Sequence, residues 1–498
     1  MKENDSINGD ERAIPDFSKH ISLVAYHPVT VGYEATKDFF DNVKDSKCNT
    51  IIWPTMHHSD VADLSNIFAY SKQCSLNVVV YTDRVYLYGD PAAGTATQAE
   101  FNSDINKLTT NVNSIISHSN LVGWMIANEP YYYNWHSPIP RGSVNLPKTT
   151  EYVSRFAPGK LVYSNLAATV NSTFIGNNST YYSYLEEYNR KFYPQLWSFN
   201  YWTISQIIGI PLKDSVRTAY FSFLEDYFKI SKATGKPFWT YCMVTPHTVF
   251  KKSDNADIKS HVTIIYPPYS ETQIRMLVLS ALAYGAKGIV YWAFAQMGDT
   301  YNKDQRFCSV KYVTAPVDRT KNKTKIFRSI KAVNTDVQSY NRIFSKCLVK
   351  KAGHLGTIPS GCTKWPDNLG IVTQIYLKIV RDGNIAGVIV SAFEPYDANR
   401  DNVDKYNSAS TTNKTYYLLI VNKDTQNNQD ITIKLTGVEN WEVHTVTDNI
   451  QGAAIGSEDN EPKRDSRKIL GLRGTMSPGD FMIVSFNPKT STTGSPFD

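Results

Sequence analysis

The sequence lacks the features that mark several classes of protein. None of its 498 residues belongs to an apolar run of about eighteen residues, the length that a transmembrane helix needs. The net charge is only +6, and because the basic residues do not gather into runs, a nucleic-acid partner is not expected. The six cysteines show no CxxC or metal-ligand spacing, so the sequence predicts neither a metal site nor a cofactor.

A polar leader opens the chain. Residues 1–18 begin with MKENDSINGDERAIPDF, which lacks the apolar core of a signal peptide. We expect this segment to be the flexible start of a mature exported protein whose signal sequence lies upstream. The protein would then act outside the cytoplasm, in the periplasm or at the cell surface, with a lipid anchor on the removed leader as one way of holding it there. We expect a monomer.

The cysteines are expected to be mainly small buried residues. Cys48 and Cys242, for example, lie in apolar contexts. A disulfide among Cys308, Cys347 and Cys362 stays open, because sequence spacing alone does not assign pairing.

Aromatic residues are abundant. The chain contains 32 Tyr and 9 Trp. These side chains combine a flat apolar face with a polar tip, which suits sugar rings and other amphipathic ligands, although they also fill cores. A carbohydrate ligand is therefore one expectation that the composition supports.

Strand-like and helix-like segments alternate over the first 350 residues. Because the strand-like segments recur about every 38 residues and each interval has room for a helix, the pattern predicts a (β/α)8 barrel closed by a last helix over 325–344. An open doubly wound sheet would also alternate, but it usually carries a Gly-rich loop after its first strand, and AYHPVTVGYE has none. The predicted strands are 20–28, 50–56, 77–81, a run from Leu121 to Glu129, 160–166, 196–202, 236–244 and 287–294.

The pattern changes after about residue 350. Short runs rich in Val, Ile and Thr are separated by Asn, Asp and Gly clusters, which is typical of an antiparallel β-sandwich. We therefore predict a barrel domain over 19–348, a sandwich domain over 349–490 and a loose tail over 491–498.

The stretch LVGWMIANEPYYY carries the strongest functional signal. Its apolar run ends directly in Asn128, Glu129 and Pro130, so a buried strand presents an acid where it emerges. Active sites of such barrels are built at the C-terminal ends of the strands. The candidate site residues at these ends are Tyr26, Trp53, His57, Asp83, Asn128, Glu129, Asn200, Tyr201, Trp202, His247, Trp292 and Asp299.

These motifs resemble those of clan A glycoside hydrolases. In that clan the fourth strand ends in Asn-Glu-Pro, and the resemblance implies that Glu129 is the proton donor and that Asn128 holds a sugar hydroxyl. A Trp commonly ends the eighth strand as the floor of the sugar site, and Trp292 in VYWAF stands there. The segment AYGAKGIVYW also resembles poorly characterised bacterial glycosidases that carry a C-terminal β-sandwich. The resemblance follows the barrel in order and, more loosely, the whole chain.

One departure from the clan concerns the second catalytic acid. Retaining members carry a Glu at the end of the seventh strand, whereas this strand ends WTYCMVT with no acid. Asp299 and Asp83 are the main candidates for a second carboxylate, and Glu271 is a weaker one. Asn200 occupies a position on the sixth strand where we would expect Asp in similar proteins. If that Asp takes part in catalysis, Asn at this position argues for weakened or absent hydrolysis.

Several candidates also have a purely structural explanation. Asp83 would form an ion pair with Arg84, Asp299 would be an ordinary loop acid, and the adjacent histidines at 57 and 58 point in different directions without a third metal ligand. We therefore expect His57 to bind a ligand or the backbone by a hydrogen bond.

The sequence thus predicts a glycosidase that acts on an oligo- or polysaccharide, with Glu129 as general acid in a surrounding of aromatic rings that includes Tyr131 to Tyr133. The alternative is a glycan-binding protein without catalysis, since the acid of the seventh strand is missing. A phosphate-dependent lyase on the same barrel is disfavoured, because no Lys or Gly-rich phosphate site follows strands seven and eight.

Overall fold

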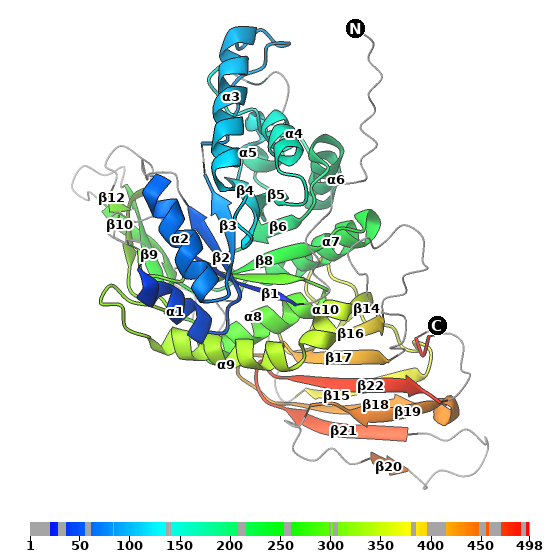
Figure 1. The fold of residues 1–498 in the computed structure, drawn as a ribbon. Coiled ribbons are helices and arrows are strands. Elements are labelled where there is room, and N and C mark those ends of the chain that lie inside the picture. Colours follow the sequence, from blue (N-terminus) through cyan, green and yellow to red (C-terminus); the bar gives the residue numbers. More distant parts are fainter. Residues whose placement is uncertain are drawn as a thin grey trace.

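Eight parallel strands close into a barrel (Figure 1). The strands are β1 (Ser22–Tyr26), β2 (Thr50–Pro54), β3 (Asn77–Tyr81), β4 (Leu121–Asn128), β5 (Leu161–Ala167), β6 (Trp197–Asn200), β8 (Phe238–Met243) and β11 (Gly288–Trp292). Because β1 pairs in parallel with both β2 and β11, the ring has no edge, which confirms the closed barrel over the open sheet. The computed structural model describes residues 20–27, 36–54, 61–82, 84–135, 139, 141–207, 216–252, 260–297, 300–301, 307–379, 385–395, 415–447, 455–457, 470–489 and 495–497.

The barrel strands are apolar on both faces because both faces are buried. Side chains alternate across a strand, so in β2 Ile52 enters the barrel interior while Ile51 and Trp53 face the surrounding helices. The interior is filled by Val24, Val79, Met125 and other side chains. The barrel is therefore a packed core, and only the rims of its strands are open to chemistry.

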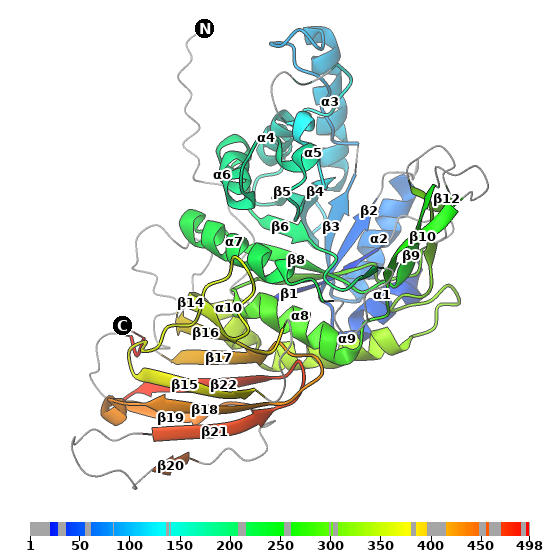
Figure 2. The ribbon, with the colours of Figure 1, turned by 180° about the vertical axis from the view of Figure 1, so that it is seen from behind.

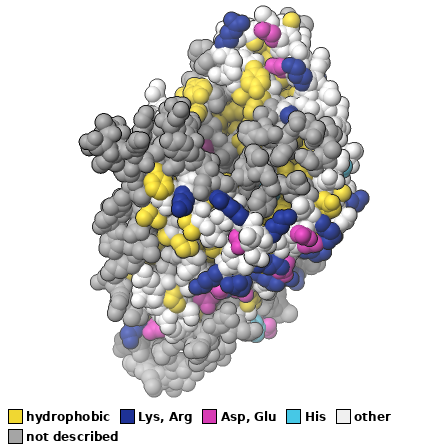
Figure 3. Space-filling model, turned by 90° about the vertical axis from the view of Figure 1, so that its left-hand side faces the viewer, with side chains coloured by type: hydrophobic (Ala, Val, Ile, Leu, Met, Phe, Trp, Pro, Cys, Tyr) yellow, Lys and Arg dark blue, Asp and Glu magenta, His cyan; other side chains and the backbone are white. Residues whose placement is uncertain are grey.

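Helices surround the barrel. They are α1 (Lys37–Asp45), α2 (Val61–Gln73), α3 (Gln98–Ile115), α4 (Leu146–Phe156), α5 (Ser172–Ile175), α6 (Tyr181–Phe192), α7 (Ala219–Thr234), α8 (Glu271–Ala283), α9 (Lys325–Ser339) and α10 (Asn341–Lys346). The helices α9 and α10 cover the segment where a closing helix was predicted. Asp45 of α1 accepts hydrogen bonds from Lys323 at 2.8 Å and from Lys331 at 2.6 Å, which ties α1 to α9 and to the segment just before it. Figure 3, a side view of the molecule, shows a dense band of Lys, Arg, Asp and Glu side chains in its lower half and a smaller group of charged side chains at the top.

A five-stranded antiparallel sheet forms from the segments that follow three barrel strands, and the sequence analysis did not predict it. Its order is β12 (Thr300–Tyr301), β13 (Phe307–Tyr312), β9 (His247–Lys252), β10 (Ser260–Tyr266) and β7 (Gln206–Ile207). These strands come from the loops after β6, β8 and β11. The sheet therefore stands at the C-terminal rim of the barrel, called the mouth below.

The C-terminal part is an antiparallel β-sandwich, as predicted. One sheet contains β14 (Cys347–Gly356), β16 (Gly387–Pro395), β17 (Tyr416–Asn422), β22 (Phe481–Pro488) and β19 (Trp441–Thr445). The other contains β15 (Val372–Ile379), β18 (Gln429–Leu435), β21 (Leu470–Met476) and β20 (Ile455–Ser457). The side chains between the two sheets, such as Val390, Ile420 and Ile433, form a second hydrophobic core.

The first sheet of the sandwich is covered on its other face by the barrel's helices. Leu419 and Ile483 belong to the same core as α8, and Phe344 of α10 packs edge-on against Phe393 with ring centroids 6.3 Å apart. Figure 2 shows α8 and α9 between the barrel and this sheet. The barrel and the sandwich therefore share a continuous hydrophobic core.

A buried polar chain also crosses this junction. Glu225 of α7 accepts hydrogen bonds from Tyr284 at 3.1 Å and from Thr363 at 2.6 Å. The Tyr284 hydroxyl lies 2.9 Å from Nε2 of His354, and Nδ1 of His354 lies 3.2 Å from the Lys423 ammonium. Burial and the charge of Lys423 lower the pKa of His354 to about 2, and burial lowers the pKa of Lys423 to about 7. His354 is therefore neutral and links the two domains by hydrogen bonds.

Two further findings concern the cysteines and the membrane. Cys347 and Cys362 are free thiols, so the disulfide that stayed open among them and Cys308 does not form. In the part of the chain that the structure describes, no helix has both the length and the apolar character to cross a membrane.

The buried Lys287 provides a test of the junction. Its ammonium donates to the carbonyls of Phe344 at 2.7 Å and Cys347 at 2.8 Å, where α10 ends and the sandwich begins. Lys287→Met would leave these carbonyls buried without that donor, which should cost roughly 2 kcal/mol or more. We expect a thermal unfolding midpoint lower by about 2 °C or more. In the control Lys331→Met, which removes an exposed ion pair with Asp45, the change should stay within about 1 kcal/mol. Equal midpoints for the two variants would contradict this role of Lys287.

Candidate active site

Glu129 lies at the C-terminal end of β4, as the sequence predicted. Its φ of 50° is in the left-handed region, which non-glycine residues seldom adopt. The following Pro130 disfavours the right-handed helical conformation at Glu129, and the backbone N–H of Glu129 donates to the carbonyl of Asn165 at 2.7 Å. An acid held in a sparsely populated backbone conformation at the mouth is a feature that functional sites often show.

A chain of asparagines holds the Glu129 carboxylate. Nδ2 of Asn200, at the end of β6, donates to Oε1 of Glu129. The Oδ1 atom of Asn200 accepts from Nδ2 of Asn165 at 3.2 Å, and the same Nδ2 donates to Asn128 at 2.8 Å. Ser198 donates to Oδ1 of Asn165 at 2.9 Å. Because each amide oxygen already accepts within this chain, the Asn200 amide is oriented with its N–H toward the acid.

Burial controls the protonation of Glu129. Removal of the carboxyl from water raises its pKa, and the hydrogen bond from Asn200 stabilises the charged form and offsets part of that rise. No other carboxylate contributes to this shift among the residues that the structure describes. A raised pKa increases the fraction of the carboxyl that is protonated near neutral pH, which is the state that can donate a proton.

Aromatic rings from distant segments gather at the mouth. We call the group formed by Trp202, His247, Tyr266, Trp292 and Tyr312 the aromatic box. The ring of Trp202 lies 4.5 Å from His247, 4.5 Å from Tyr266 and 5.1 Å from Trp292, measured between centroids. Tyr312 lies 5.4 Å from His247. Trp202 follows Asn200, the donor to Glu129, by two residues, so the Cα atoms of Trp202 and Asn200 lie within about 7.6 Å of each other.

His247 is a neutral hydrogen-bonding group in this box. Its Nδ1 lies 2.9 Å from the carbonyl oxygen of Thr245, and since a carbonyl can only accept, Nδ1 carries the proton. Burial lowers the pKa of His247 to about 4, so the ring is neutral at pH 7 and Nε2 is an acceptor. The Thr245 hydroxyl also donates to the carbonyl of Ala293 and accepts from its N–H, both at 2.7 Å. These bonds fix the end of β8 against the residue that follows Trp292.

Three predicted site residues lie elsewhere than expected. Trp53 is only 2% exposed and stacks on Phe40 of α1 with centroids 5.6 Å apart, so it faces the helices and not the mouth. The physical reason is the alternation of side chains along β2, in which Ile52 takes the interior position. Tyr201 packs on Phe223 of α7 at 5.1 Å, with the Arg217 guanidinium 4.7 Å from its ring, and therefore lies on the outer side of the rim.

Tyr26 lies inside the barrel. It is buried, and its ring centroid is 6.1 Å from that of Tyr241. The predicted residues that the structure brings together at the mouth are Asn128, Glu129, Asn200, Trp202, His247 and Trp292.

Among the residues that the structure describes, no candidate for the second catalytic acid lies at the mouth. His57, Asp83 and Asp299 lie outside them. Glu271 is in the first turn of α8, where it is exposed and pairs with Arg275 at 3.3 Å, so it is not available to the mouth. The strand β8 is buried along its whole length and carries no acid. Among the residues described, no cluster of three or more His, Cys, Asp and Glu side chains is suited to hold a metal ion.

Sequence analysis missed Tyr266 and Tyr312. Tyr266 is the last residue of β10 and Tyr312 the last residue of β13, and both contribute rings to the aromatic box. The β-branched residues of SHVTIIY are a strand signal that the sequence analysis did not use. Their position beside Trp292 depended on the pairing of β9, β10 and β13, which local sequence does not reveal.

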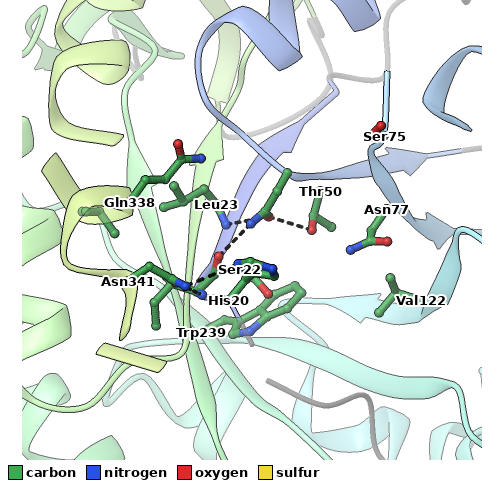
Figure 4. A pocket seen from close by; sticks show the side chains of 13 residues that line it. His20, Ser22, Leu23, Thr50, Ser75, Asn77, Val122, Trp239, Gln338 and Asn341 are labelled. Atoms are coloured by element: carbon green, nitrogen blue, oxygen red, sulfur yellow. Dashed lines mark hydrogen bonds between the residues drawn. The ribbon is translucent and has the colours of Figure 1, made fainter. Parts of the chain in front are cut away.

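A cavity of about 660 Å³ lies at the opposite rim of the barrel (Figure 4). Ser22, Thr50 and Asn77, from the first residues of β1, β2 and β3, line it together with Val122 and Trp239. This is the N-terminal end of the strands, where conserved features of such barrels serve stability and not chemistry. The cavity is therefore separate from Glu129.

Comparisons with known proteins find only distant structural likeness. No family model matches the sequence, and no curated protein matches it. One similar solved structure is a catalytic mutant of a GH42 β-galactosidase from G. stearothermophilus. The two chains share 8% identity, the match covers 94% of this chain and 98% of that chain, and the TM-score is 0.46. An endo-β-1,4-mannanase from Thermotoga petrophila has 11% identity, 86% and 96% coverage and a TM-score of 0.39. An α-L-fucosidase of family GH29 from Bacteroides thetaiotaomicron has 8% identity, 93% and 82% coverage and a TM-score of 0.41. Likeness at this level does not identify an activity.

The asparagine chain leads to a test of the Glu129 pKa. Asn200→Asp removes the donor to Glu129 and adds a negative charge beside it, and both changes favour the protonated acid. We expect the pKa of Glu129 to rise by about one unit or more, measured by NMR titration of protein labelled with 13C at glutamate carboxyl groups. Asn171→Asp is the matched control, because it adds the same charge at the N-terminus of α5 and keeps a good helix cap. A similar shift in both variants would contradict direct contact between Asn200 and Glu129.

Proposed function

We propose that the protein hydrolyses a glycosidic bond in an oligo- or polysaccharide, with Glu129 as general acid. The observation that carries this proposal is the position of one partly buried carboxyl, with a raised pKa, at the mouth of a closed barrel, where it is held by Asn200, two residues before Trp202 of the aromatic box. A carboxyl whose pKa is raised by burial can protonate the leaving oxygen of a glycoside near neutral pH. Ring faces beside it provide the surface on which a sugar packs.

The neighbouring groups have distinct roles in this proposal. Trp292 and Trp202 contact the faces of the sugar ring, and Nε2 of His247 accepts a hydrogen bond from a sugar hydroxyl. Asn128 is exposed, and its Nδ2 takes no part in the asparagine chain, so it binds another hydroxyl. Asn200 holds Glu129 in place between turnovers, and after proton transfer it stabilises the carboxylate that forms.

The stereochemical outcome depends on the second carboxylate. A separation of about 5 to 5.5 Å from Glu129 would give retention of configuration, and about 6.5 to 9.5 Å would leave room for a water and give inversion. The two remaining candidates are Asp83 and Asp299, at the ends of barrel strands three and eight.

A second candidate function is glycan binding without catalysis. The observation that favours it is the absence of an acid from β8, which is buried from Phe238 to Met243. The two functions share the aromatic box and Asn128. They differ in whether Glu129 transfers a proton.

The variant Glu129→Gln separates the two functions. It keeps an acceptor for Asn200 but cannot donate a carboxyl proton. We expect turnover to fall by at least about 10²-fold, the lower end of what general acid catalysis contributes, while affinity for the glycan changes little. The assay follows product release by mass spectrometry on a panel of defined di- to hexasaccharides of glucose, galactose, mannose, xylose and fucose.

Measurements on the same panel can also contradict the proposal. Product formation at the wild-type rate in Glu129→Gln would remove this residue from the mechanism. Measurable glycan affinity without product from the wild-type protein would favour the binding function. A variant at the outer rim, Tyr201→Phe, serves as control and should leave turnover within a few fold of the wild-type rate.

A further inference from the structure

Exposed apolar side chains are unevenly distributed over the molecule. Among the described residues, eight large hydrophobic side chains are exposed: Tyr88, Tyr131, Tyr133, Val170, Tyr193, Val313, Ile358 and Tyr376. Five of them, Tyr88, Tyr131, Tyr133, Val170 and Val313, lie in segments that follow barrel strands and so belong to the mouth side. A concentration of this kind indicates a binding surface more than scattered apolar residues do.

Two of these side chains form a stacked pair directly after Glu129. The rings of Tyr131 and Tyr133 lie 5.5 Å apart between centroids with an angle of 15° between their planes. Phe174 of α5 extends the group, with its ring 5.3 Å from that of Tyr131. We call Tyr131, Tyr133 and Phe174 the rim shelf. Tyr131 is 43% and Tyr133 48% exposed.

Tyr132 anchors the rim shelf from below. Its hydroxyl donates to the two carboxylate oxygens of Glu187 on α6, each at 3.2 Å, and its ring packs edge-on against Trp135 at 4.8 Å. Gly176, with a φ of 63°, makes room for this ring, because a Cβ there would lie 2.4 Å from Cζ of Tyr132. The segment is therefore fixed by the middle tyrosine while the residues on either side face outward.

This arrangement limits how far the rim shelf can lie from the acid. Consecutive Cα atoms are 3.8 Å apart, so the Cα of Tyr131 lies within about 7.6 Å of that of Glu129. Figures 1 and 2 both show α5, which carries Phe174, at the upper ends of β4 and β5. A chain of sugars that places one bond at Glu129 therefore reaches the rim shelf with its next units.

We propose that the rim shelf is a second saccharide-binding subsite, on which further units of a glycan chain pack against the rings of Tyr131 and Tyr133. This inference rests on the proposed function, since it takes the ligand of the mouth to be a glycan. Two parallel, anchored rings present flat apolar faces at a low cost in side-chain entropy, and they suit the C–H faces of pyranose rings. The protein then prefers chains longer than a disaccharide.

The test uses the Glu129→Gln protein, so that binding is measured without cleavage. Isothermal titration calorimetry with the di- to hexasaccharides of the panel should give an affinity that rises with chain length. In the double variant Tyr131→Ala and Tyr133→Ala, the affinity for the longer chains should fall by roughly tenfold, about the loss of one aromatic stacking contact, while the affinity for disaccharides changes little.

Two controls separate stacking from general effects. Tyr131→Phe together with Tyr133→Phe keeps both rings and should retain the affinity for long chains. Tyr376→Ala removes a tyrosine that is similarly exposed, at 42%, but lies on the sandwich strand β15, and it should change nothing.

The possible results distinguish the two proposals. Glycan binding with an affinity that is independent of chain length, or equal in the double alanine variant, would overturn the rim shelf and leave the proposed function intact. Absence of binding for every member of the panel, together with absence of product from the wild-type protein, would overturn both.

Discussion

The closure of the parallel barrel is the constraint on which the rest of the structure depends. Since all eight strands run in one direction and the ring has no edge, their C-terminal ends meet at one rim, and the packed interior leaves that rim as the place where side chains from different strands can meet. Asn128, Asn165 and Asn200 come from β4, β5 and β6, and their amides touch only because the strands are neighbours in register. The position of Glu129 follows from the same closure.

Aromatic side chains at the mouth occur in two different settings. In the aromatic box, rings from β10, β11 and β13 pack on one another and around His247, whose pKa is lowered by burial to about 4. On the rim shelf, Tyr131 and Tyr133 are each a little less than half exposed, and they cover part of each other's surface by stacking. Aromatic side chains thus form a mutually packed group at one place and a half-exposed stacked pair at another.

The sequence allowed the barrel strands and the position of Glu129 to be predicted, because a strand buried on both faces has a continuous apolar run and its end is visible where polar residues begin. The sequence was a poorer guide to the direction in which each side chain points. Trp53 was placed at the mouth, although a shift of one residue along β2 decides between the mouth and the helices. The sheet of β7, β9, β10, β12 and β13 could not be foreseen, because some of its strand pairs join segments about 60 residues apart, and so Tyr266 and Tyr312 were missed.

Helix α8 has no side in contact with water over most of its length. From Ile274 to Ala283 nearly every residue is buried, since the barrel covers one side of the helix and the strand β17 covers another. A helix in a barrel usually keeps a wet outer face, which lets it shift or tolerate new residues at small cost. Here that freedom is absent, and α8 leads directly into the strand that ends in Trp292. The sandwich thus restricts the movement of α8 and, through it, of Trp292. Substitutions on the face of the sandwich that meets α8 would therefore alter the position of the Trp292 ring, although they lie far from Glu129.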